Sequence, residues 1–201
     1  SYLLNELKDG EVNDFVNDSM IQIKYMSKTL SDFRNFLKPS TKKKLFSISK
    51  ALNEINEIIG KQVFYSNIEM TFNYKNENEE LLVYGYENEF KQVLLNLINN
   101  AKNKIVEKNI DFRKKAQIKI NIERSAYYNI IEIIDDGGAI DEKIINSIFD
   151  PYFTTKETGT GFGLYMAKVI IEDKMRGIIT VKNVNDTVVF TIKLPHKKVQ
   201  K

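Results

Sequence analysis

The chain has 201 residues, 42% of them hydrophobic, so it can bury the core of one domain with an appendage or of two small domains. Thirty basic residues against 27 acidic ones leave a net charge of +3, too small to indicate a nucleic-acid surface. No cysteine is present, which excludes disulfides, thiolate nucleophiles and cysteine zinc sites. The apolar runs are far shorter than the roughly 20 residues of a membrane-spanning helix, so we expect a soluble, cytoplasmic chain.

The first predicted element is a helix with an apolar seam. Apolar residues recur at alternating spacings of three and four, with Ser19 filling the remaining place: Val12, Val16, Ile23, Met26, Leu30, Phe33 and Leu37. So narrow a stripe must be buried against other helices. We expect the helix 12–37 to form a bundle with a second copy of the chain, a homodimer; packing on its own domain is the alternative. Since the sequence starts inside this helix-compatible stretch without a methionine, we expect a piece of a longer protein.

Pro39 is predicted to end this helix, because the residue before a proline is pushed out of the helical region. We therefore expect two domains, 1–39 and 40–201. In the second, apolar periodicity predicts a helix from Phe46 to Ile59 that Gly60 stops, and further helices near 87–107, 141–148 and 162–173. Alternating segments predict strands at 67–74, 81–86, 117–123, 129–135, 178–182 and 187–194. The mixture predicts an α+β fold, a two-layer sandwich with helices on one face of a mixed sheet.

The helix predicted at 87–107 has an apolar side and an amide side. Gln92, Asn96, Asn100 and Asn103 share the face opposite its apolar residues. Neutral asparagine oxygens one turn apart can coordinate a hard Mg²⁺ ion whose other ligands are water and nucleotide phosphates. A merely solvated polar face is the alternative.

A first glycine box follows the strand predicted at 129–135. The apolar strand leads directly into Asp135, Asp136, Gly137 and Gly138, which places a carboxylate beside backbone without side chains. A buried aspartate can accept from the exocyclic amine of adenine, a bond worth roughly 1.5 to 3 kcal/mol or about 10- to 150-fold in affinity. An ordinary turn explains the same residues without a ligand.

A second glycine box precedes the helix predicted at 162–173. Gly159, Gly161 and Gly163 occupy alternate positions, which suits backbone amides presented to phosphate, and Thr160 adds a hydroxyl. A flexible linker is the alternative. Five of the nine glycines of the chain lie in these two boxes. An ordinary turn in one box and a flexible linker in the other are therefore hard to sustain together, which favours a shared nucleotide site.

In order, the asparagine helix, DDGGA, IFDPYFTTK and GTGFGL resemble the N, G1, F and G2 boxes of sensor histidine kinases of two-component systems, whose catalytic domain has the GHKL (Hsp90-like) ATPase fold. IKYMSKTLSDFRNFLKP resembles the second helix of the dimerisation and phosphotransfer hairpin. The resemblance implies a histidine kinase, itself a phosphoprotein. It gives the γ-phosphoryl group of Mg-ATP to a histidine, for transfer to a response regulator receiver domain. It leaves open an inner-membrane anchor of the parent protein, with no direct membrane contact in this fragment.

The resemblance also assigns residues. It implies Asn100 as the principal Mg²⁺ ligand with Asn96 beside it, and Asp135 as the adenine anchor. Phe149 and Phe153 resemble aromatic residues at the base of an ATP lid spanning 150–160, although core packing explains them equally well. The remaining nucleotide-binding residues implied are Asn103, Gly137, Gly138, Lys156, Gly159, Thr160, Gly161, Gly163 and Leu164.

Three departures from the family pattern carry expectations. Ala139 replaces a glycine, so ATP binding is expected to weaken if that residue needs a positive φ. The only histidine, His196, is expected in an exposed tail after the last strand, so the phosphoacceptor histidine is expected outside this chain. Asn96 stands where related ATPases carry a glutamate that activates water, which favours phosphoryl transfer over hydrolysis.

Two other functions remain open at this stage. One is a regulatory or dimerisation module with a degenerate nucleotide pocket. The other is a serine kinase of the anti-sigma-factor type, although such proteins generally lack the preceding phosphotransfer helix.

Overall fold

The computed structural model describes residues 15–17, 19, 20, 23, 40, 42–75, 80–108, 115–156 and 160–196. The chain divides into two compact units, residues 1–38 and 39–201. In the first unit the described residues are helical, and the predicted seam residues Val16 and Ile23 are 50% and 58% exposed. The other apolar seam residues and Pro39 lie outside the described residues.

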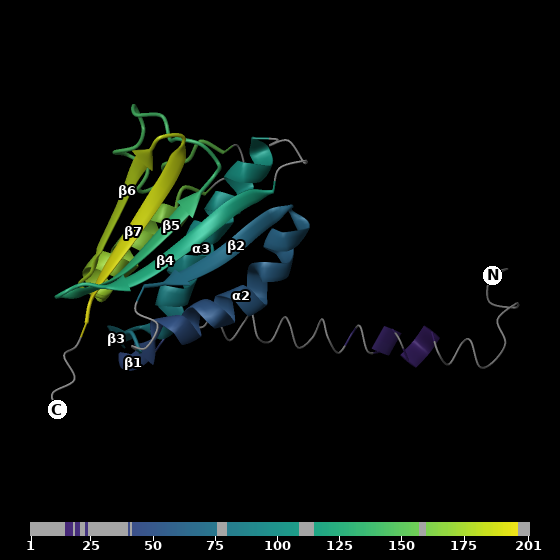
Figure 1. Cartoon of the computed structure of the whole chain (residues 1–201), viewed down its shortest axis with the longest axis horizontal. Coiled ribbons are helices and arrows are strands. Elements are labelled where there is room, and N and C mark those ends of the chain that lie inside the picture. Colours follow the sequence, from purple (N-terminus) through teal and green to yellow (C-terminus); the bar gives the residue numbers. More distant parts are fainter. Residues whose placement is uncertain are drawn as a thin grey trace, which may run out of the picture. The chain divides into compact units, whose positions relative to one another are not determined.

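The second unit is built on a five-stranded mixed sheet in the order β2-β4-β5-β7-β6 (Figure 1). β2 (Ile68–Tyr74) runs parallel to β4 (Ala116–Arg124), whereas the remaining neighbours, β5 (Tyr128–Asp135), β7 (Thr187–Pro195) and β6 (Ile178–Val184), pair antiparallel. All five were predicted to within two residues at either end. Alternate residues of β5 are buried, and this alternation gives the last of them, Asp135, the same face as Ile131 and Ile133.

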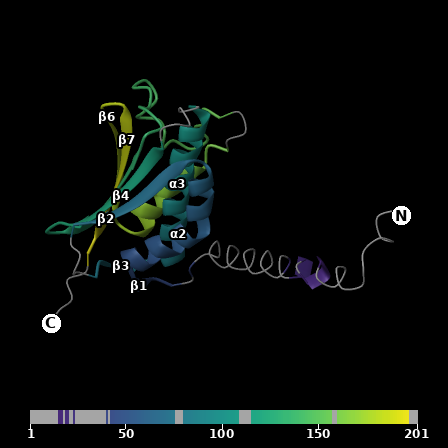
Figure 2. The same cartoon turned by 45° about the vertical axis from the view of Figure 1, so that its right-hand side comes forward.

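Helices cover one face of this sheet (Figure 2), which confirms the predicted two-layer α+β sandwich. They are α2 (Ile48–Tyr65), α3 (Glu87–Glu107), α4 (Gly163–Lys168) and the π-helix η1 (Val169–Lys174). α3 packs against α2, α4, β4 and β5 through buried residues that include Phe90, Leu94 and Leu97. It therefore lies directly beside the end of β5.

The first helix of this unit differs from the prediction at both ends. Phe46 belongs to a short strand, β1 (Lys44–Ser47), which pairs antiparallel with β3 (Leu82–Gly85) in a separate two-stranded sheet. α2 continues past Gly60 to Tyr65, so the predicted stop at this glycine is wrong. An interior glycine costs only about 1 kcal/mol, and buried Val63 continues the apolar face beyond it.

Two later helices also differ. Residues 141–148 form successive turns and not the predicted helix, since only the Ile145 amide makes an α-type bond, to the Asp141 carbonyl at 3.1 Å. The helix predicted at 162–173 is divided between α4 and η1. The wider π turn accompanies burial of the adjacent residues Ile170 and Ile171 together with Met175.

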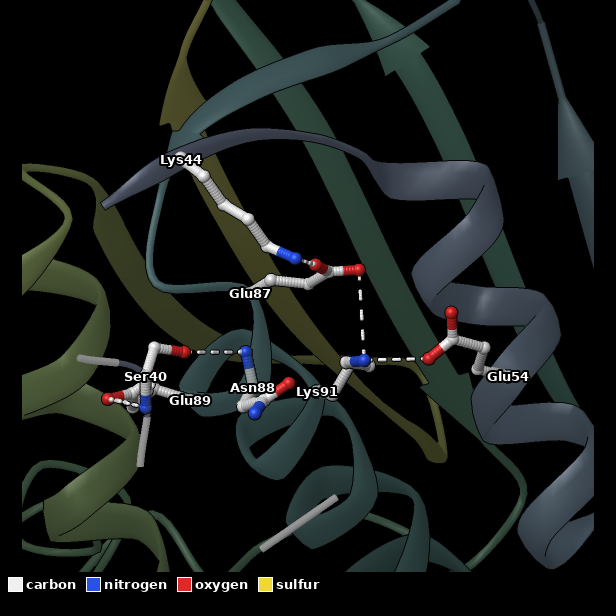
Figure 3. Close-up of polar contacts among 7 residues, drawn as sticks. All are labelled: Ser40, Lys44, Glu54, Glu87, Asn88, Glu89 and Lys91. Carbon is white, nitrogen blue, oxygen red and sulfur yellow. Dashed lines mark hydrogen bonds and ion pairs between the residues drawn. The ribbon is translucent and has the colours of Figure 1, made fainter. Parts of the chain in front are cut away.

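α3 begins with a capping arrangement whose serine comes from a distant segment. The N-cap residue Tyr86 makes no side-chain cap bond. Instead the Asn88 amide donates to Ser40 Oγ at 3.2 Å, and the Ser40 amide donates to both carboxylate oxygens of Glu89 at 3.2 and 3.3 Å (Figure 3). These reciprocal bonds are those of a capping box, which is normally made by residues three apart. Here Ser40 and Asn88 are 48 residues apart.

A charged network ties the same end of α3 to its neighbours (Figure 3). The Lys91 ammonium, with a side chain only 8% exposed, lies 2.6 Å from Glu54 of α2 and 3.7 Å from Glu87. Lys44 of β1 also pairs with Glu87. A buried lysine with carboxylate partners on two elements fixes the start of α3 against α2, because separating them leaves a charge without compensation.

Removing the distant cap is expected to destabilise the second unit by about 1 kcal/mol, the usual cost of losing a capping side chain. Ser40→Ala deletes the acceptor of the Asn88 amide, and Glu89→Ala leaves the Ser40 amide unpaired. Because both side chains serve one arrangement, the double variant is expected to lose less free energy of unfolding than the sum of the single losses. Denaturant titration measures this, with Glu57→Ala, an exposed carboxylate of α2, as the control. Strictly additive losses would refute the coupling.

Candidate nucleotide-binding site

A cavity of about 460 Å³ lies beside α3, where β5 ends, and the segment leading to α4 lines it. It is large enough for a nucleotide. Nine predicted binding residues line it: Asn96, Asn100, Asp135, Phe153, Lys156, Thr160, Gly161, Gly163 and Leu164. Thr154 and Thr155, inside the lid predicted at 150–160, also line the cavity. Sequence reasoning missed other lining residues, among them Lys104, Glu107, Ile140, Ile144, Ile148, Val188 and Phe190.

Of the other five predicted residues, four are not brought into the cavity lining. Asn103 is exposed, because three residues after Asn100 the helix has turned about 300°, and it is the fourth, Lys104, that faces the cavity. Gly137 and Gly138 are buried beside the cavity without lining it. Phe149 makes an edge contact with Phe190 at 6.3 Å between ring centres, which favours its packing role. Gly159 lies outside the described residues.

The asparagine end of the cavity contains a polar group without a partner. Among the described residues, Asn96 Nδ2 is buried and has no hydrogen-bond partner, although an unpaired buried amide is costly. Gly163 lies against this side chain, since a Cβ added there would come 2.5 Å from Asn96 Oδ1. Asn100 lies one turn further along α3 and lines the same cavity. The amide N–H groups and oxygens of this end are therefore placed for a ligand.

The donor set at this end fits Mg²⁺. Within the described ranges no group of three or more histidine, cysteine or acidic residues could hold a metal ion. At this end of the cavity α3 provides the side-chain carbonyls of Asn96 and Asn100, neutral ligands that suit an ion already shared with phosphate oxygens.

The other end of the cavity contains the carboxylate of Asp135. The side chain is 3% exposed, and its Oδ1 accepts a hydrogen bond from the Gly137 amide at 2.9 Å. Burial raises the pKa of Asp135, while the Gly137 hydrogen bond and the nearby Lys104 charge oppose that rise. Burial likewise lowers the pKa of Lys104. Because the Gly137 amide donates only to Oδ1, the Oδ2 atom of this buried carboxylate can accept a hydrogen bond from an N–H group of a nucleotide base.

The loop after Asp135 is shaped around Lys104. The Lys104 ammonium donates to the carbonyls of Gly138 at 2.6 Å and Ala139 at 3.2 Å. Positive φ occurs at Gly138, +83°, and not at Ala139. The strain expected of Ala139 is therefore absent, because the residue that needs the left-handed conformation is still a glycine.

The loop before α4 is held against Tyr152. Gly161 has a φ of +68°, and a Cβ there would come 2.3 Å from the carbonyl carbon of Tyr152, whose own φ is +65°. The rings of Tyr152 and Phe162 meet edge to face at 4.6 Å. In the segment predicted as the lid, the Lys156 ammonium lies 3.7 Å from Glu107 of α3. This segment therefore contacts the helix that carries the asparagines.

His196 lies at the far end of the sheet. It is half-buried and not in a free tail: its amide donates to the Tyr127 carbonyl at 3.2 Å, and its Nε2 lies 3.0 Å from the Ala126 carbonyl oxygen. Its other ring nitrogen lies 3.4 Å from Arg124. β5 runs from this end to Asp135, which separates the two by roughly 23 Å at the usual rise per residue.

Comparison with known proteins agrees with this geometry. Residues 85–198 match the family described as histidine kinase-, DNA gyrase B-, and HSP90-like ATPase. Sporulation kinase A of Bacillus subtilis (strain 168) is 30% identical over 170 residues, 84% of this chain but 27% of the relative. The catalytic domain of histidine kinase ThkA superposes with a TM-score of 0.68 at 31% identity, covering 77% of this chain and 96% of that domain. A structure of ThkA in complex with response regulator protein TrrA has a TM-score of 0.65 at 22% identity, covering 98% of this chain and 55% of that one.

The chain belongs to the histidine kinase-, DNA gyrase B-, and HSP90-like ATPase family. Within that class it contains the ATP-binding domain of sensor histidine kinases, and ATP is the ligand of this domain. The chain spans about a quarter of the length of sporulation kinase A. In the part of the chain that the structure describes, no helix has the length and apolar character needed to span a bilayer.

Proposed function

We propose that residues 40–201 bind Mg-ATP in this cavity and donate its γ-phosphoryl group to a histidine outside the chain. The observation that carries the proposal is the division of one cavity between an amide end, Asn96 and Asn100, and a carboxylate end, Asp135. Amide oxygens and N–H groups suit a metal ion and phosphates, whereas a buried carboxylate suits an exocyclic amine.

The residues have separate tasks in this proposal. Asp135 orients the base, and Ile144, Ile148 and Leu164 provide apolar surface along the cavity. Mg²⁺ held by Asn100 with Asn96 beside it would neutralise phosphate charge. Asn96 cannot take a proton from water, so hydrolysis has no general base at this position. Positioning of the phosphoryl group for an incoming nucleophile is then the main contribution.

Lys156 and Thr160 provide donors on the lid side of the cavity. In this structure the Lys156 ammonium lies near Glu107, with both side chains partly exposed, so the pairing is weak and phosphate can compete for the lysine.

The acceptor and the partners belong to the same proposal. His196 is an unsuitable acceptor, because it lies roughly a strand length from Asp135 and both ring nitrogens have polar neighbours. We assign residues 1–39 to a partial dimerisation and phosphotransfer region that pairs with a second copy through the helix 12–37. The next acceptor is a response regulator receiver domain, a proposal supported by the complex of ThkA with TrrA. We further propose a cytoplasmic setting for the domain.

The chain is expected to bind Mg-ATP without labelling itself, and to phosphorylate a supplied helical hairpin that carries a histidine. Radiolabelled ATP and gel separation measure both results, with Asn100→Ala as the control that is expected to abolish transfer. A serine substrate in parallel separates this function from a serine kinase. Absence of ATP binding would support the degenerate module, and labelling of His196 would overturn the proposed acceptor.

A further inference from the structure

Lys104 lies in the cavity outside both glycine boxes, and its contacts are not those of a solvated lysine. It lies on α3 one turn beyond Asn100 and lines the cavity with Asp135. Its ammonium donates to two backbone carbonyls, Gly138 at 2.6 Å and Ala139 at 3.2 Å. Because two of its three N–H groups are engaged by carbonyls, the amine is held in place.

The loop that Lys104 holds is also the loop that orients Asp135. The Gly137 amide donates to Asp135 Oδ1 at 2.9 Å, and Gly137 directly precedes the two carbonyls bound by the lysine. A Cβ at Gly137 would come 3.1 Å from Cβ and Cγ of Lys104, so the loop packs directly on the lysine stem. Fixing these carbonyls fixes the Gly137 amide, and that amide fixes Oδ1 and leaves Oδ2 for a ligand.

We propose that Lys104 is a positioning residue for the nucleotide base, acting through residues 137–139 on the carboxylate that accepts the 6-amino group. The inference rests on the proposed function, because it requires Asp135 to be the adenine anchor. The lysine also acts through its charge. Its ammonium favours the ionised carboxylate and partly offsets the rise that burial causes in the pKa of Asp135.

The test compares the affinities of ATP and of purine riboside triphosphate, which differs from ATP only in lacking the 6-amino group. Lys104→Met is expected to weaken ATP binding about tenfold, the effect of losing a charge-assisted hydrogen bond, and to weaken the analogue less than threefold. Lys102→Met is the matched control. Lys102 lies on α3 two residues before Lys104 and does not line the cavity. The control is expected to change both affinities less than threefold.

Equal losses for both nucleotides in Lys104→Met, with a wild type that discriminates between them, would overturn the role of Lys104 and leave Asp135 as the anchor. An equal loss of discrimination in Lys102→Met would overturn it as well, because loss of a lysine charge from α3 alone would then suffice. A wild type that binds both nucleotides equally would remove Asp135 as anchor and the role of Lys104 with it. If Lys104→Met does not fold, Lys104→Gln is judged by the same ratios.

Discussion

Asp135→Asn is expected to weaken ATP binding at least tenfold without lowering the stability of the nucleotide-free protein. The loss follows from replacing a buried charged acceptor, whose hydrogen bond to a donor is worth roughly 1.5 to 3 kcal/mol. The asparagine Oδ1 can still accept from the Gly137 amide, so the loop keeps its native bond. Calorimetry measures the affinity, and unchanged affinity would remove Asp135 as the base anchor.

The stability of this variant has a pH dependence of known sign. Burial raises the pKa of Asp135 above its ordinary 3.8, so the ionised side chain is less favourable in the folded chain than in the unfolded chain. The protonated Asp135 side chain thus contributes fully to folding stability below pH 3.8. This contribution is lost as the pH rises through the higher pKa of the folded chain. An uncharged asparagine avoids the loss. The unfolding free energy of the variant relative to wild type is therefore expected to increase from about pH 4 towards neutrality.

Asp136→Asn is the matched control. The neighbouring carboxylate accepts from the Gln117 amide at 2.8 Å and does not line the cavity. It is expected to leave ATP affinity within about twofold of wild type. If Asp135→Asn lowers the free energy of unfolding at neutral pH by as much as it weakens the free energy of ATP binding, the carboxylate is structural and does not serve the ligand.

Gly161→Ala is expected to reduce ATP affinity at least tenfold by displacing the loop before α4. At a φ of +68° an alanine costs about 1 to 2 kcal/mol. Its Cβ would also come 2.3 Å from a backbone atom of Tyr152, an overlap that no rotation of a side chain relieves. The loop must move, and Thr160 and Gly163, which line the cavity on either side of this residue, move with it. Calorimetry and a lid-sensitive proteolysis assay measure the change.

Gly60→Ala is the same chemical change in a different setting. Gly60 lies inside α2, where a Cβ would meet only the movable side chain of Asn56, so alanine is expected to stabilise the helix by about 1 kcal/mol. ATP affinity is expected to stay unchanged. Near-native affinity of Gly161→Ala would contradict the role assigned to the φ of that residue.

Most of the fold follows from periodicity, because the signals are local. β5 alternates between buried and half-buried residues along its length, and α3 begins and ends at the predicted residues. The errors lie where tertiary contacts determine the secondary structure. Gly60 is a local stop signal that the buried face of α2 overrides, and the four residues of β1 become a strand only by pairing with β3.

The site was predictable where residue type determines chemistry. Few residue types can perform the tasks of this site, and the structure brings Asn96, Asn100, Asp135, Gly161 and Gly163 to one cavity, while their roles in binding stay predictions. Lys104 was missed because a lysine on a polar helix face resembles a solvated one until the chain brings two carbonyls to it. The condition set for Ala139 is not met, because Gly138 takes the positive φ, and sequence alone does not show which of two adjacent residues does so.

Ser40 also bears on how far the ATP-binding domain extends. The family match begins at residue 85, and the strands and helices of the second unit begin at Lys44. A chain shortened to start at Lys44 would keep every one of them and still lose the serine that completes the first turn of α3. A chain that starts at Lys44 is therefore expected to be about 1 kcal/mol less stable than one that keeps Ser40, so expression or crystallisation trials should begin at or before Pro39.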